Sequence, residues 1–215
     1  MGGATSDAGH PSHRADARRN RQRLIEAAIE LILEIGGEPS RDAVAHRAGV
    51  GIATLYRHFP DRQTLLHAVV LDVLDRAIDR GEVALADSIT GTQALRRYMH
   101  DAIDCGLGVV NVVHALLDTT DWPDRRVAAQ RVLDRLVEVA RVDGAIGADV
   151  SATTIALATI RFCRPLAIGL DPADERLIAH QQLDSYLDGL ATSAGQPDHQ
   201  WPALPPPTGT QLPPP

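Results

Sequence analysis

Residues 49–62 place several hydrogen-bond donors at helical spacing. Leu55 and Phe59 lie four residues apart, so they are predicted to share the buried face of a short helix. The residues left facing outward are Ile52, Ala53, Thr54, Tyr56, Arg57 and His58. Hydroxyl, guanidinium and imidazole groups on an exposed helix can bind phosphates and touch base edges. The segment therefore predicts DNA recognition.

A tight turn and a preceding helix must position these side chains. Residues 41–48 are predicted to form a short helix with its small apolar side chains facing inward, capped by Ser40. Gly49 then stands where the chain turns sharply, and glycine adopts a positive φ without steric cost. Asp61 is placed to cap a further helix that begins at Arg62.

The net charge of −7 is unevenly divided along the chain. Residues 1–80 hold 11 arginines and 11 acidic residues, whereas residues 81–215 hold 10 and 17. Five arginines fall within residues 14–23, and the chain contains no lysine. This distribution is typical of one DNA-facing end on an acidic body. The arginine cluster is expected to contact the DNA backbone or minor groove, with a solvated helix face as the alternative.

Periodicity and composition predict an all-α fold. Aromatic residues make up only 3% of the chain, so the core must consist mainly of aliphatic side chains, which suits packed helices. Helices are expected at about 16–35 and 62–80, and the second has no linker before it. Further helical stretches are expected within residues 92–190, at about 92–103, 109–117, 122–140, 151–168 and 172–190.

Residues 15–66 resemble the DNA-binding domain of the TetR family of transcriptional regulators. The resemblance lies in Leu24-Ile25-Glu26-Ala27-Ala28, Ala48-Gly49-Val50, Thr54-Leu55-Tyr56-Arg57-His58-Phe59 and in Arg62, Leu65 and Leu66. It implies an N-terminal three-helix helix-turn-helix domain and a C-terminal helical domain for ligand binding and dimerisation. It also implies a homodimer that binds a palindromic DNA operator, represses transcription and is released by a small-molecule effector.

The resemblance assigns roles to individual residues. Tyr56, His58 and Arg62 are expected on phosphates, and Arg41, Ile52, Ala53 and Thr54 near the bases, with Gly51 and Arg57 completing the expected DNA-binding set. Two departures concern the tip of the recognition helix. Gly51 replaces a Ser or Thr cap, and Ile52 replaces a polar base reader. Apolar contact with thymine methyl groups is therefore expected there.

The expected domains are a disordered arm at 1–13, the DNA-binding domain at 14–66, the ligand-binding and dimerisation domain at 67–194 and a disordered proline-rich tail at 195–215. The last two helices are expected to form the dimer interface. A soluble, cytoplasmic protein is expected, because the sequence has no signal peptide and no apolar run long enough to span a bilayer.

Candidates for the ligand pocket are the polar or aromatic residues of otherwise aliphatic helices. They are His100, Asp104, Cys105, His114, Trp122, Phe162 and Cys163. His100/Asp104 and His114/Asp118 have a spacing that can bind a divalent metal, but ordinary polar residues are favoured, so no metal and no cofactor are predicted. No catalytic motif appears, and no enzyme activity is expected. The alternatives are an enzyme or a helical adaptor with an incidental helix-turn-helix.

Overall fold

A computed structural model describes residues 11–117, 123–164 and 169–193. These residues form helices and loops and include no β-strand, which confirms the all-α prediction for this part of the chain. The elements are α1 (Pro11–Ile35), α2 (Arg41–Arg47), α3 (Ile52–His58), α4 (Arg62–Asp87), α5 (Gly91–Asp104), α6 (Gly108–Val113), the 3₁₀ turn η1 (His114–Leu116), α7 (Pro123–Val142), α8 (Ala152–Phe162) and α9 (Pro172–Ser193).

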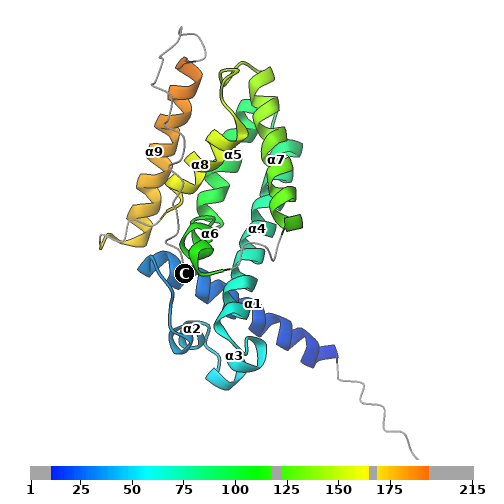
Figure 1. Cartoon of the computed structure of the whole chain (residues 1–215), viewed down its shortest axis with the longest axis vertical. Coiled ribbons are helices and arrows are strands. Elements are labelled where there is room, and N and C mark those ends of the chain that lie inside the picture. The colour runs from blue at the N-terminus through cyan, green and yellow to red at the C-terminus, as the bar shows by residue number, and fades with distance from the viewer. Residues whose placement is uncertain (1–10, 118–122, 165–168, 194–215) are drawn as a thin grey trace, which may run out of the picture.

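The first three helices lie at one end of the molecule (Figure 1). The helix α1 begins at Pro11, within the segment 1–13 that the sequence predicts to be a disordered arm. Proline suits the first turn of a helix because its missing N–H has no helical partner there. Ser40 Oγ accepts a hydrogen bond from Ala43 N, and Asp61 Oδ1 accepts one from Thr64 N, which confirms both predicted caps.

The helix α4 connects this end with the rest of the molecule (Figure 1). It continues to Asp87, beyond the predicted end at Arg80. Gly81 lies within α4 and does not end it. The absence of a side chain at Gly81 leaves space that neighbouring helices fill. A Cβ at this position would lie 2.3 Å from Val132 Cγ1 of α7 and 3.4 Å from the Tyr98 ring of α5. Gly81 thus allows three helices to approach closely.

Gly106 lies between α5 and α6, and Gly108 is the first residue of α6. Gly106 has a φ of 81°, and a Cβ at Gly108 would lie 1.9 Å from the carbonyl oxygen of Cys163. The predicted helix over 151–168 was too long, since α8 ends at Phe162 and Cys163 caps it. Pro165 accounts for the early end, because the residue before a proline is disfavoured in the helical region. Residues 165–168 lie outside the described part of the chain.

The buried apolar side chains form two clusters. One packs α1, α2 and α3 against the first half of α4 and against α6, with Ile32, Leu55 and Phe59 fully buried in it. The other packs α5, α7, α8 and α9 around the second half of α4, and it includes Met99 and Leu136. Because α4 belongs to both, the two clusters are joined by a continuous helix. No helix of the described residues is long and apolar enough to cross a membrane.

Candidate nucleic-acid interface

The turn between α2 and α3 sets the direction of the recognition helix. Gly49 has a φ of 62°, as predicted. Leu55 and Phe59 are fully buried, and this anchors α3 against α1 and α4. Gly51 supplies no side-chain cap to α3. The first turn of α3 therefore keeps unpaired backbone N–H groups, which are themselves suited to binding a phosphate.

The outward face of α3 is apolar at its tip and polar further along. Ile52 is 37% exposed and Tyr56 is 46% exposed. Thr54 is only partly exposed, and its hydroxyl accepts a hydrogen bond of 3.1 Å from Arg57 Nη2. The exposed side chains at the tip of α3, Ile52 and Ala53, are therefore apolar.

Arg41 is held beside Tyr56. Its Cζ lies 4.6 Å from the centre of the Tyr56 ring, and its Nη1 donates to the carbonyl oxygen of Pro60 at 3.2 Å. A guanidinium over an aromatic face is attracted by the ring quadrupole. The start of α2 and the middle of α3 thus present a guanidinium and a phenol side by side.

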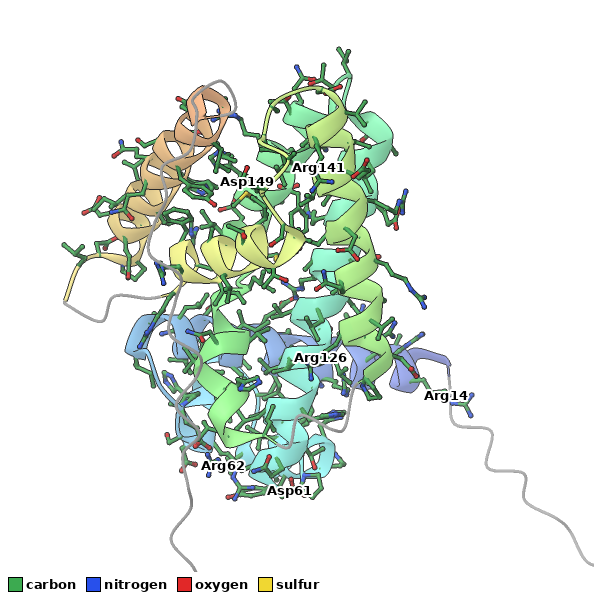
Figure 2. The ribbon with its side chains drawn as sticks, turned by 45° about the horizontal axis from the view of Figure 1, so that its top comes forward. Arg14, Asp61, Arg62, Arg126, Arg141 and Asp149 are labelled. Atoms are coloured by element: carbon green, nitrogen blue, oxygen red, sulfur yellow. The ribbon has the colours of Figure 1, made fainter. Side chains whose placement is uncertain are left out.

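His58 and Arg62 follow on the same side of the motif. Burial, and then the charges of Arg57 and Arg21, lower the pKa of His58, so its imidazole is neutral at neutral pH and can offer one N–H to a phosphate. Arg62 Nε lies 2.5 Å from Glu38 Oε1 in the loop between α1 and α2. Figure 2 shows Arg62 and Asp61 at the α3 end of the molecule.

Two arginines of α1 also reach this motif. Arg21 Cζ lies 5.2 Å from the centre of the Phe59 ring, and a Cβ at Gly49 would lie 2.8 Å from Arg23 Nη2. Arg14 lies near the beginning of the same helix, away from α3 (Figure 2). The sequence pattern located the arginine cluster, but it contained no sign that Glu38 would bind Arg62, because the two residues are brought together only by the fold.

Comparisons with known proteins agree with this geometry. The family described as "Bacterial regulatory proteins, tetR family" matches residues 24–69. An HTH-type transcriptional regulator from Staphylococcus aureus strain USA300 is 44% identical over 63 residues, which span 29% of this chain and 34% of that protein. A TetR transcription regulatory protein from Mycobacterium vanbaalenii is 30% identical, with a TM-score of 0.60, over 83% of this chain and 98% of that one. This chain belongs to the TetR family.

The TetR-family assignment makes the protein a DNA-binding transcriptional regulator, and the related proteins are regulators and not enzymes. The TetR-like regulator LfrR from Mycobacterium smegmatis, solved in complex with proflavine, has the same fold with a TM-score of 0.57. It is 22% identical, and the match covers 79% of this chain and 97% of that one.

The residues predicted for the ligand pocket of this TetR-family chain are spread over several places. Phe162 and Cys163 line a cavity beside α1, whereas Asp104 and Cys105 line a second cavity between α4 and α5. Burial raises the pKa of Cys105 to about 11 and raises that of Cys163 further, so both thiols are protonated. His100 contacts His180 of α9, which in turn contacts Asp104. His114 is exposed on η1, and Trp122 lies outside the described residues.

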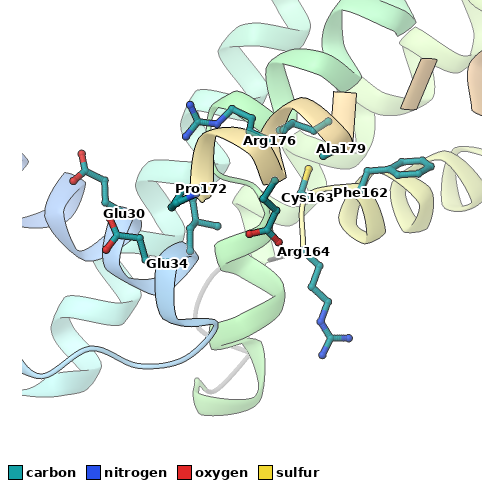
Figure 3. Close-up of a pocket in the computed structure, with 11 residues that line it drawn as sticks. Glu30, Glu34, Phe162, Cys163, Arg164, Pro172, Arg176 and Ala179 are labelled. Carbon is teal, nitrogen blue, oxygen red and sulfur yellow. The ribbon is translucent and has the colours of Figure 1, made fainter. Parts of the chain in front are cut away.

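The cavity beside α1 has a volume of about 140 Å³ and lies where α1 meets the ends of α8 and α9 (Figure 3). Leu33 and Phe162 contribute apolar surface, and Glu30 and Glu34 contribute carboxylates. These two carboxylates also bind Arg47 at the end of α2, at 3.3 Å from Glu30 and 2.7 Å from Glu34. The hydrogen bond from Arg47 lowers the pKa of Glu34, which keeps that carboxylate ionised. The cavity wall and the helix-turn-helix therefore share an ion-pair network.

Proposed function

We propose that this TetR-family regulator is a homodimeric repressor that binds a palindromic operator and is released by a small molecule. The observation that supports this most is the grouping of Arg41, Tyr56, His58 and Arg62 around an exposed α3. Affinity then comes mainly from phosphate contacts, because the exposed tip of α3 offers few side-chain donors. Specificity comes from a few bases, read through Ile52, Ala53 and Thr54, and from the dimer spacing.

The functional division that we propose follows the predicted boundaries. Residues 14–66 bind DNA, residues 67–194 bind the effector and the second subunit, and the segments 1–13 and 195–215 are accessory. The shared helix α4 supports mechanical coupling between the two parts, because side chains from both hydrophobic clusters pack on it.

The dimer interface is proposed on the outer faces of α8 and α9. Leu183 and Leu187 are buried within the monomer, so these two leucines serve its own core. Leu157 of α8 is 61% exposed and Leu177 of α9 is 57% exposed. Large apolar side chains at these exposed positions favour contact with a second copy in a four-helix arrangement. Two recognition helices would then be placed about one turn of DNA apart, or roughly 34–36 Å.

The cavity beside α1 is our candidate effector site. Its carboxylates bind Arg47, so a ligand that attracts Glu30 or Glu34 would weaken the attachment of α2 to α1. The structure of LfrR with proflavine supports ligand binding by a protein of this fold. Release from DNA would follow because α2 and α3 pack on each other and move together.

The decisive experiment is selection of binding sites from a random DNA library with the full-length protein. We expect enrichment of an inverted repeat, bound by a dimer with strong salt dependence. Sedimentation of the selected complex would then give its stoichiometry. Enrichment of no sequence, or of a single half-site bound by a monomer, would contradict the proposal.

A further inference from the structure

Two histidines and two aspartates form a continuous line of contacts between α5 and α9. His100 Nδ1 lies 2.7 Å from His180 Nδ1. The other nitrogen of each ring faces a carboxylate, with His100 Nε2 at 3.0 Å from Asp184 Oδ1 and His180 Nε2 at 3.2 Å from Asp104 Oδ1. We name these four residues the histidine tetrad.

The two imidazole rings of the tetrad meet edge to edge. Their planes are 19° apart and their centres are separated by 4.9 Å. The two Nδ1 atoms are 2.7 Å apart, and the separation of the ring centres is larger by the sum of the two ring radii. Both nitrogens therefore lie on the line that joins the two ring centres. The lone pair or the N–H of a ring nitrogen lies in the ring plane and points away from the ring centre. The two Nδ1 atoms therefore point directly at each other.

The contacts of the tetrad require more hydrogens than two neutral rings can supply. A neutral imidazole has one N–H, and an ionised carboxylate has none. Three contacts in line need three hydrogens, whereas two neutral histidines provide two. Any placement of two hydrogens leaves one contact in which two acceptors face each other. We infer that the tetrad binds one additional proton, held between His100 and His180, and that this proton fastens α9 to α5.

The carboxylates of the tetrad do not supply this hydrogen themselves. The hydrogen bond from His100 lowers the pKa of Asp184, and Arg96 donates to the same carboxylate, so Asp184 remains ionised. Asp104 is exposed to water. The third hydrogen must therefore come from a protonated ring.

The charges around the tetrad favour a bound proton. Arg96 and Asp104 face it from α5, and Asp184 and Asp188 face it from α9. Cys163 follows α8, and burial keeps its thiol neutral. From α4, Arg76, Asp79 and Arg80 line a cavity together with Asp101 and Asp104 of α5. With the groups of α9 and Arg96, five carboxylates and three guanidinium groups surround the tetrad. The site is therefore negative without the proton, and the proton reduces that excess.

A metal ion does not fit in place of the proton. Zinc bonds to histidine nitrogen are about 2.0–2.1 Å long, so an ion on the line between two opposed nitrogens needs roughly 4 Å between them. The observed distance is 2.7 Å. Within residues 11–117, 123–164 and 169–193, no group of three or more His, Cys, Asp or Glu side chains is arranged to hold a metal ion.

The bound proton makes the packing of α9 dependent on pH. Above the ordinary titration range of histidine, the unfolded chain holds both rings neutral, whereas the folded tetrad holds one proton more. Stability must then fall as pH rises, because the folded state binds more protons. The expected change is about tenfold per pH unit in the equilibrium between docked and undocked α9, until the tetrad loses its proton. This inference rests on neither operator nor effector binding.

The test is nitrogen NMR of the full-length protein with ¹⁵N-labelled histidine, at about pH 7.5, one unit above the ordinary histidine pKa. We expect His100 and His180 together to hold three N–H hydrogens. The number of N–H hydrogens on these two rings should be the same with and without EDTA. Two neutral rings, or signals that change when EDTA removes a metal, would overturn the inference.

Hydrogen exchange of the α9 amides gives a second measurement. After correction for intrinsic exchange, protection of α9 should fall with rising pH in the parent protein and should lose that dependence in His180→Asn. His46→Asn, which changes an exposed histidine of α2, serves as the matched control and should keep the parent behaviour. An equal pH dependence in all three proteins would contradict the proposed proton. The NMR measurement on the parent protein stands even if His180→Asn fails to fold.

Discussion

Arg62 Nε lies 2.5 Å from Glu38 Oε1, so the guanidinium expected on a DNA phosphate is held by a carboxylate of the same chain. The two side chains are 45% and 31% exposed. An exposed ion pair contributes only about 0–1 kcal/mol, so a phosphate can displace Glu38. The pair holds the Arg62 guanidinium at the loop between α1 and α2 in the free protein.

Arg62→Ala should weaken binding to all DNA sequences by a similar factor. Loss of one phosphate contact is expected to lower the slope of log K against log salt by about 0.9. Fluorescence anisotropy at several salt concentrations measures both quantities. An unchanged salt slope would remove Arg62 from the phosphate contacts.

Glu38→Gln should strengthen DNA binding, because it frees Arg62 from an ionised competitor. The expected gain is at most about fivefold, which corresponds to the ~1 kcal/mol limit of an exposed pair. Glu26→Gln is the matched control, since Glu26 lies on α1 and its partner is Arg76 of α4. If both variants gain DNA affinity equally, the gain comes from the change in net charge and not from breaking the Arg62–Glu38 ion pair.

Ile52→Ala should alter sequence preference more than overall affinity. Ile52 is exposed at the tip of α3, where an apolar side chain can contact a thymine methyl group. Binding-site selection with the variant should show relaxed preference at one position of each half-site. Val83→Ala removes a similarly exposed side chain of α4 and should leave the selected site unchanged. An identical consensus for Ile52→Ala would exclude it from base reading.

Gly49→Ala should destabilise the protein by roughly 1–2 kcal/mol, because an L-residue with a Cβ is strained at positive φ. The φ of Gly49 is 62°. Gly51→Ser is the control within the same motif, since Gly51 has a φ of −68° and a Cβ there meets no atom within 4 Å. Serine would add a cap to α3 and should leave stability equal or slightly higher. Chemical denaturation compares the three proteins.

Acidification should weaken the start of α4. Hydrogen bonds from the backbone and hydroxyl of Thr64 lower the pKa of Asp61. Because the folded pKa is the lower one, this stabilisation is present above the unfolded pKa and disappears as pH falls through the folded value. The stability difference between the parent and Asp61→Asn should therefore begin to shrink as pH falls through about 4, the ordinary pKa of Asp, and should continue to shrink below it. A constant difference would show that charge plays no part in the cap.

Local chemistry explains which features of the fold could be predicted. Ser40, Gly49 and Asp61 act within their own turns, so residue type and spacing were sufficient. The continuation of α4 beyond Arg80 includes Gly81. The side chains of Val132 and Tyr98 occupy the space that a Cβ at Gly81 would fill. Such contacts join residues that are distant in the sequence, so a periodic pattern in the sequence does not reveal them.

The same distinction applies to the candidate sites. The exposure of Ile52 and Tyr56 followed from helical periodicity. The residues predicted for the effector pocket are polar or aromatic side chains inside apolar helices, and this property does not indicate which of them meet. The sequence indicates His100, but its partner His180 lies eighty residues later, on another helix.

The 26 residues of α4 extend over about 39 Å at 1.5 Å per residue. One end begins at Arg62 beside the recognition helix, and the other lies among α5 and α7. A small tilt of a helix of this length displaces its far end by several ångströms. In the proposed dimer, two recognition helices would have to fit successive grooves of one duplex and would tolerate little such error. A modest change among the distant helices would therefore be enough to break the match.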